Sequence, residues 1–252
     1  MNVVMLEGMI GEPIPYSLRS DWMVTTMLFM CMVVVSVVFS KGRKYWLQAI
    51  RNLSLNRERG SMFDEVTAAD VRHTFLLVAH SFLMLGLCVY YYWVHKNPML
   101  FEKVSHGYLL IGSVFSVVVL QFLRWILYQL VNWTFFQKVR NMLWMTAFFH
   151  LHITLGLCFL SVFLLVVYFD VSMQVSSWII GILLFFAKIA LFWKCFSNFF
   201  EKIYGVLHLI LYFCALEILP DLIWWKGMEW MSNNLILNLY SLENKENSRL
   251  SA

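Results

Sequence analysis

The run AFFHLHITLGLCFLSVFLLVVYF, Ala147–Phe169, decides the fold class, because it contains no Asp, Glu, Lys or Arg. An α-helix rises about 1.5 Å per residue, so about 20 mostly apolar residues cross the hydrocarbon core of a bilayer. This run is long enough to do so. It therefore predicts a transmembrane helix.

The whole chain shares this apolar character. Of its 252 residues, 61% are hydrophobic and 13% are charged, and the mean hydropathy is +0.69. A soluble domain is about 45–50% apolar and about 25% charged. Because the apolar residues are spread along the entire length, no room is left for a separate soluble domain. We expect an all-α fold, a polytopic transmembrane helix bundle that forms a single integral-membrane domain.

Six stretches are long and apolar enough to be spans, and they lie at about 23–40, 74–94, 107–131, 147–169, 176–194 and 205–225. Together they form one membrane domain over residues 23–226. A short tail precedes it at residues 1–22. The polar residues 227–252, which end in SLENKENSRLSA, predict a disordered C-terminal tail.

The positive charges gather in alternate connections, which predicts the orientation. The connection after the first span is rich in Lys and Arg, the one after the third holds Lys138 and Arg140, and the one after the fifth holds Lys194 and Lys202. Basic connections stay on the cytoplasmic side. With an even number of spans, both termini are expected on the outer, periplasmic side of a cytoplasmic (inner) membrane.

Several classes of protein are disfavoured by the sequence. The net charge of +4 lies in the connections, so nucleic acid is not an expected partner. The five cysteines form no Cys-x-x-Cys pair, and the sequence has no HExxH, GxSxG, P-loop or GxGxxG motif. His150 and His152 are two residues apart and so face different sides of a helix, which disfavours a b-type haem. We expect no metal and no cofactor, and an enzyme is less favoured than a non-enzyme.

Five spans carry a basic or titratable side chain in their cytoplasmic half: His80, Arg124, His150, Lys188 and His208. Ionisable residues inside a bilayer are costly, and they usually face the bundle interior and mark function. Helical spacing places Arg124 on one stripe with Ser113, Ser116, Gln121 and Tyr128. The alternatives stay open, because Arg124 and Lys188 can snorkel toward the interface and a neutral histidine there is often structural.

Glu217 lies near the middle of the last span, in LYFCALEILPDLIWW (Leu211–Trp225). Its side chain is too short to snorkel, so it must be protonated, paired, or solvated in a cavity. Asp221 follows four residues later on the same face, and Pro220 leaves the carbonyl of Leu216 without its amide partner. Broken helices of this kind bind protons or cations in transporters. The alternative is an ion pair from Glu217 to Arg124 or Lys188 that only fixes helix packing.

The segment CALEILP, Cys214 to Pro220, together with FDEVTAADVRHTFLLVAHSFLML and LVNWTFFQKVRNMLW, resembles a family of multi-pass inner-membrane proteins of the Bacteroidota, known as domain of unknown function 4271. The resemblance runs from about the first span to Lys226. It implies a bacterial cytoplasmic membrane and a polytopic helical fold. It supplies no established activity, so no residue role is carried over. In the family, the residue after the proline is often apolar, which places Asp221 below Glu217 as a candidate.

Three functions fit these observations. The leading hypothesis is binding or transport of an ion or a small anionic solute, with Glu217 as the proton or cation acceptor and Arg124 and Lys188 as its counter-charges. The second is a membrane scaffold or assembly factor that binds partner membrane proteins of an envelope complex. The third is a lipid-headgroup enzyme at the cytoplasmic face that uses His80, His150 and Arg124 around a phosphate.

Overall fold

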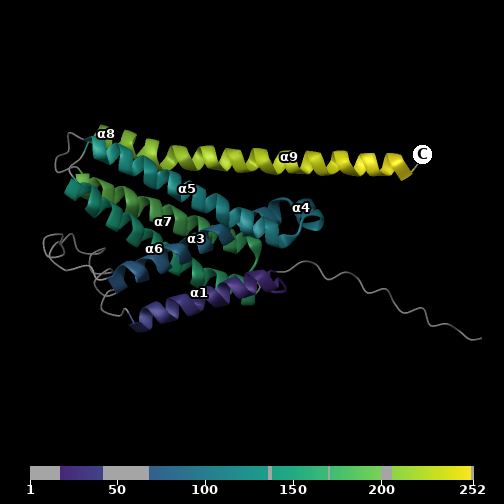
Figure 1. Cartoon of the computed structure of the whole chain (residues 1–252), viewed down its shortest axis with the longest axis horizontal. Helices are drawn as coiled ribbons and strands as arrows, with labels where there is room; N and C mark the ends of the chain where they lie inside the picture. The colour runs from purple at the N-terminus through teal and green to yellow at the C-terminus, as the bar shows by residue number, and fades with distance from the viewer. Residues whose placement is uncertain (1–17, 42–67, 136–137, 170, 200–205, 251–252) are drawn as a thin grey trace, which may run out of the picture.

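The computed structural model describes residues 18–41, 68–135, 138–169, 171–199 and 206–250 (Figure 1). Over these residues the chain forms helices and no strand, which confirms the all-α prediction. Most of the predicted N-terminal tail and of the basic connection after the first span lies outside the described residues. The inside–outside orientation therefore stays a prediction.

Among the described residues, five helices are long and apolar enough to cross a membrane. They correspond to five of the six predicted spans, and the chain is accordingly a multi-pass membrane protein by length and composition. The helices begin and end beyond most of the predicted limits, and they are α1 (Trp22–Lys41), α3 (Ala68–Lys96), α5 (His106–Phe135), α6 (Lys138–Tyr168) and α7 (Met173–Phe199).

The sixth predicted span contains a π turn. Residues 206–225 are helical, as α8 (Val206–Phe213) is followed directly by the π-helical turn η3 (Cys214–Ile218) and then by α9 (Leu219–Leu250). The residues on either side of the turn, Phe213 and Leu219, keep α-helical dihedral angles. At the end of the turn, the Leu219 N–H donates to the carbonyl of Cys214, five residues back. Pro220 has no N–H to continue an α-helical ladder, and a π turn is one way to accommodate the loss.

The predicted disordered tail is wrong, because α9 continues as a helix to Leu250. No proline follows Pro220, so the ladder that begins in the span can propagate. Two contacts hold the first turns beyond the span: Lys96 Nζ lies 3.1 Å from Glu229 Oε1, and Asn97 Nδ2 donates to Ser232 Oγ at 2.8 Å. Figure 1 shows α9 running past the ends of the other helices, with the C-terminus at its tip and the short α4 (Pro98–Lys103) near its middle.

The helices pack in two regions. In the first, α3 lies against α1, α5 and α6, and its apolar core contains Tyr90, Phe159 and Phe163. A Cβ atom added at Gly156 of α6 would lie 2.6 Å from the Cα atom of Ser81 of α3, so this crossing requires a glycine.

The second region lies where α5, α6 and α7 meet α8 and η3. Its buried core consists of Tyr128, Trp144, Met145, Phe148, Leu191, Cys195, Phe213 and Leu216. The rings of Tyr128 and Trp144 lie 5.3 Å apart, centroid to centroid. This aromatic packing fixes the side of α5 that faces the π turn, and the candidate site is built there.

Candidate functional site

Glu217 lies on the π turn and is fully buried, with 0% of its side chain exposed. Its Oε1 atom accepts a hydrogen bond from the Tyr128 hydroxyl at 2.8 Å, and its Oε2 atom accepts one from Lys188 Nζ at 2.6 Å. Arg124 Nη2 lies 3.5 Å from Oε2. A single carboxylate thus joins η3 to α5 and α7.

Asp221, one turn later on α9, contacts the same two cations. Its Oδ1 atom forms an ion pair with Arg124 Nη2, and its Oδ2 atom lies 2.9 Å from Lys188 Nζ. We call Arg124, Lys188, Glu217 and Asp221 the charge quartet. It contains two cations and two anions, so its formal charge is zero, and each cation contacts both carboxylates. Buried charges are tolerated only with such pairing and hydrogen bonding.

The π turn also supplies a backbone acceptor to the quartet. Arg124 Nη2 donates to the carbonyl oxygen of Glu217 at 3.0 Å. The sequence placed the freed carbonyl at Leu216, and the structure records the side-chain hydrogen bond one residue later. In a π turn the amide donors are displaced by one residue, so a carbonyl can take a side-chain partner, and such turns occur frequently at functional sites.

Two members of the charge quartet are buried and the other two are half-buried. Glu217 and Arg124 are 0% and 3% exposed, whereas the side chains of Lys188 and Asp221 are 33% and 36% exposed. The two half-buried members come from α7 and α9. The exposed atoms of the quartet therefore belong mainly to Lys188 and Asp221.

The three predicted histidines are not part of the contacts described for the charge quartet. His80 is buried at 2% exposure next to Gly156, in the interface of α3 and α6, and neither ring nitrogen has a hydrogen bond of good geometry among the described residues. His150 is half-buried on α6. His208 lies on α8, and its side chain is outside the described part of the chain.

Two neighbours of the quartet were not selected from the sequence. Tyr128 shares the predicted stripe with Arg124, so its role as a donor to Glu217 could have been found there. His152 is buried at 5% exposure on α6, with its Nδ1 atom 2.9 Å from the Phe148 carbonyl oxygen, and the charges of Glu217, Arg124 and Lys188 act on its ring. The choice between His150 and His152 depends on the rotation of α6, which the sequence does not give.

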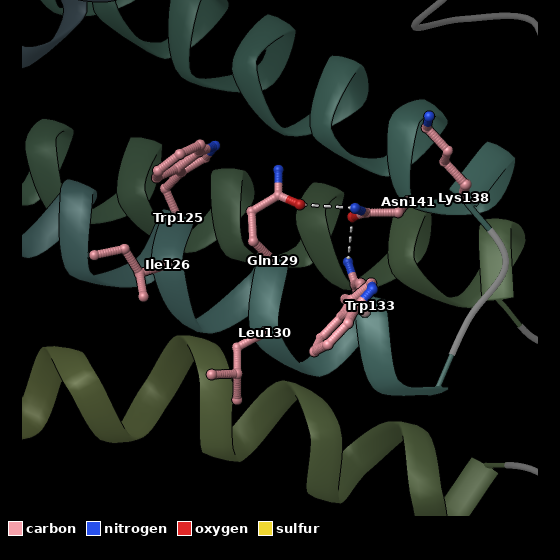
Figure 2. Close-up of a pocket in the computed structure, with 8 residues that line it drawn as sticks. Trp125, Ile126, Gln129, Leu130, Trp133, Lys138 and Asn141 are labelled. Carbon is pink, nitrogen blue, oxygen red and sulfur yellow. Dashed lines mark hydrogen bonds between the residues drawn. The ribbon is translucent and has the colours of Figure 1, made fainter.

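A chain of polar side chains extends from this region to the end of the bundle. The rings of Tyr128 and Tyr212 lie 6.0 Å apart, and the Tyr212 hydroxyl donates to Asn132 Oδ1 at 2.5 Å. Asn132 Nδ2 donates to Asn141 Oδ1 at 2.9 Å, and Asn141 Nδ2 donates to Gln129 Oε1 at 2.8 Å (Figure 2). These bonds join α5, α6 and α8.

The charge quartet places a buried carboxylate against two cations and a phenol. A carboxylate held by two cations and a phenol can exchange its partners when a proton or an anion arrives. Among the described residues, no group of three or more His, Cys, Asp or Glu side chains is arranged to hold a metal ion. The absence of a metal or cofactor stays a prediction.

One known protein family matches the part of the chain that contains this site. The family described as domain of unknown function 4271 (DUF4271) matches residues 24–228. The match begins in α1, ends in α9 and includes every residue of the charge quartet, and it confirms the resemblance found in the sequence. Neither a curated protein nor a solved structure matches the chain.

Proposed function

We propose, on the premise that the chain belongs to the DUF4271 family, that it transports a small anionic solute together with a proton across a bacterial cytoplasmic membrane. The observation that carries this proposal is the neutral, closed cycle of contacts around the fully buried Glu217. Five candidate spans among the described residues and a sixth helical segment with a π turn support the polytopic bundle that such a function needs.

Because the quartet is neutral, binding of an anion and binding of a proton favour each other. An anion that binds Lys188 or Arg124 must displace a carboxylate, which leaves an uncompensated negative charge in a buried site. Protonation of Glu217 or Asp221 removes that charge and frees a cation. Because each event makes the other more favourable, proton and anion bind together, and the coupling is reciprocal.

The unequal exposure of the quartet suggests a division of roles. Lys188 and Asp221 are half-buried, so Lys188 is the group that meets the anion. Glu217 is sealed and bonded to Tyr128, so it is the proton acceptor. Arg124 is held by the Glu217 carbonyl as well as by both acids, and it keeps the site positive when a carboxylate is protonated.

A second candidate function is a non-transporting scaffold. It is favoured by one specific observation, namely that both carboxylates are already paired with both cations, which ties α5, α7 and α9 together without any ligand. The lipid-headgroup enzyme has less support, because His80 lies in the interface of α3 and α6 while Arg124 belongs to the quartet.

Transport is tested with the full chain in proteoliposomes loaded with a fluorescent pH indicator. An inward gradient of chloride, nitrate, phosphate or sulfate is applied, one at a time, with the membrane potential clamped. We expect one of these anions to acidify the interior with wild type and with Glu229→Gln, a surface control. Glu217→Gln, which mimics the protonated acid, should not respond.

Two results would count against transport. One is acidification by Glu217→Gln at the wild-type rate. The other is no proton movement with any of the four anions, combined with recovery of the thermal stability of Glu217→Leu by a second change, Arg124→Leu. That combination identifies the quartet as a structural lock.

A further inference from the structure

A groove of about 890 Å³ lies where α5 ends and α6 begins (Figure 2). It is not part of the charge quartet. Its lining combines aromatic and aliphatic side chains with amides and one cation: Trp125, Ile126, Gln129, Leu130, Asn132, Trp133, Lys138 and Asn141.

The depth of the groove follows from the ends of two candidate spans. One span ends at Thr134, and the next begins at Arg140. The polar lining residues Asn132, Lys138 and Asn141 lie on either side of this boundary, so the mouth of the groove is at the level of the lipid headgroups. Trp133, which is 85% exposed, has the position at which amphipathic rings anchor to a bilayer interface.

The lining changes from polar to apolar along α5. Trp125, Ile126 and Leu130, which lie toward the bilayer interior, are 37%, 40% and 61% exposed. At the other end, Lys138 is exposed and makes no ion pair with the described residues. A ligand that matches this gradient has an anionic head and a hydrocarbon tail. Basic pockets between helices at a membrane surface bind anionic headgroups in this manner.

The amides of the groove are held in fixed orientations. Asn141 donates to Gln129 and accepts from Asn132, so all three side chains are positioned by one another. Figure 2 shows the amide nitrogen of Gln129 directed away from its bond with Asn141. Its N–H groups can therefore donate to the ester or glycerol oxygens of a ligand without rearrangement.

From this geometry we propose that the groove binds one anionic phospholipid. Lys138 contacts the phosphate, the Gln129 amide donates to headgroup oxygens, and Ile126 and Leu130 contact the start of an acyl chain. The groove uses no residue of the charge quartet, so lipid binding there can be measured whether or not the proposed transport is correct.

The test is native mass spectrometry of the full chain in detergent, titrated with phosphatidylglycerol or with phosphatidylcholine of the same acyl chains. We expect wild type to bind its first phosphatidylglycerol more tightly than phosphatidylcholine. Lys138→Gln should weaken phosphatidylglycerol binding about fivefold, as expected for one Lys near an anionic lipid. Arg72→Gln, which removes an exposed basic residue from the start of α3, should leave it unchanged.

A second variant tests the apolar part of the groove. In Leu130→Trp the larger side chain would occupy part of the groove, so the affinity for phosphatidylglycerol should fall. Because Leu130 is exposed, the protein should keep its melting temperature. The proposal is overturned if the two lipids bind equally, or if Arg72→Gln weakens binding as much as Lys138→Gln. It is also overturned if glycerol phosphate displaces the lipid at equal concentration, which would identify a site for a soluble phosphate.

Discussion

The two packed regions of the bundle are held together by different kinds of side chain. Between α3 and α6, a glycine and a serine bring the backbones together around aromatic rings. Between α5, α7, η3 and α9, four charged side chains and a tyrosine form contacts beside the apolar core. In lipid, close packing of small residues and polar bonds are the two available means of helix association. The second region therefore depends on ionised side chains for part of its packing, whereas the close contact of Gly156 with Ser81 involves none.

The largest effect is expected for Glu217→Ala, which leaves two cations without their buried partner. Breaking a buried ion pair from one side costs about 3–5 kcal/mol. The melting temperature in detergent should fall strongly, and Arg124→Leu in the same chain should restore part of the loss. If Glu217→Ala melts like wild type, the quartet does not hold the second region together.

Tyr128→Phe should have the next largest effect. It removes the hydrogen bond to Glu217 but keeps the ring against Trp144 and Phe148. A hydrogen bond to a charged group contributes about 1.5–3 kcal/mol. The measurement is thermal unfolding beside Tyr168→Phe, an exposed tyrosine of α6. Equal curves for the two variants would contradict the role of Tyr128.

Gly156→Ala tests the first region by adding a methyl group, whereas the two variants above remove a contact. The added methyl group would meet the backbone of Ser81 at 2.6 Å, and overpacking of this kind costs about 1–3 kcal/mol. Gly181→Ala is the matched control, because nothing lies within 4 Å of a Cβ atom there. Similar melting temperatures for both variants would show that α3 and α6 separate easily.

We expect the smallest effect for Glu229→Gln, a change on α9 beyond the predicted span 205–225. Hydrogen bonds from Lys96 and then from Lys226 lower the pKa of this carboxyl group. A lowered pKa stabilises the folded state at pH values above the unfolded value of about 4.3, and the stabilisation is lost as pH falls through the folded pKa. The melting temperatures of wild type and Glu229→Gln should therefore differ slightly at pH 7 and converge in acid. A constant difference down to pH 3 would contradict this.

The sequence predicted what depends on composition and left open what depends on rotation and register. The run from Ala147 was correctly predicted to be a helix, which ends at Tyr168, since a helix satisfies all the backbone polar groups of so long an apolar segment in lipid. The pairing of Glu217 with Arg124 or Lys188 was foreseen as an alternative, and the structure shows both contacts. Asp221 was placed below Glu217 on a family pattern, yet it contacts the same two cations.

Two features could not be derived from residue types. The π turn depends on how the chain relieves the missing donor of Pro220, for which a kink or a break would serve as well. The helix after residue 226 depends on continuity with the span before it, whereas its polar composition favours disorder when the segment is considered alone. Both features therefore depend on the segments that adjoin them.

The π turn gives the molecule a mechanical property as well as a chemical one. It contains one residue more than an α-helical turn, and α9 follows it directly for 32 residues, about 48 Å at the usual rise. Converting the turn to α geometry would rotate α9 against α8 by about 100° and shift it by about 1.5 Å. The position of the projecting end of α9 thus depends on the geometry of the π turn that carries Glu217.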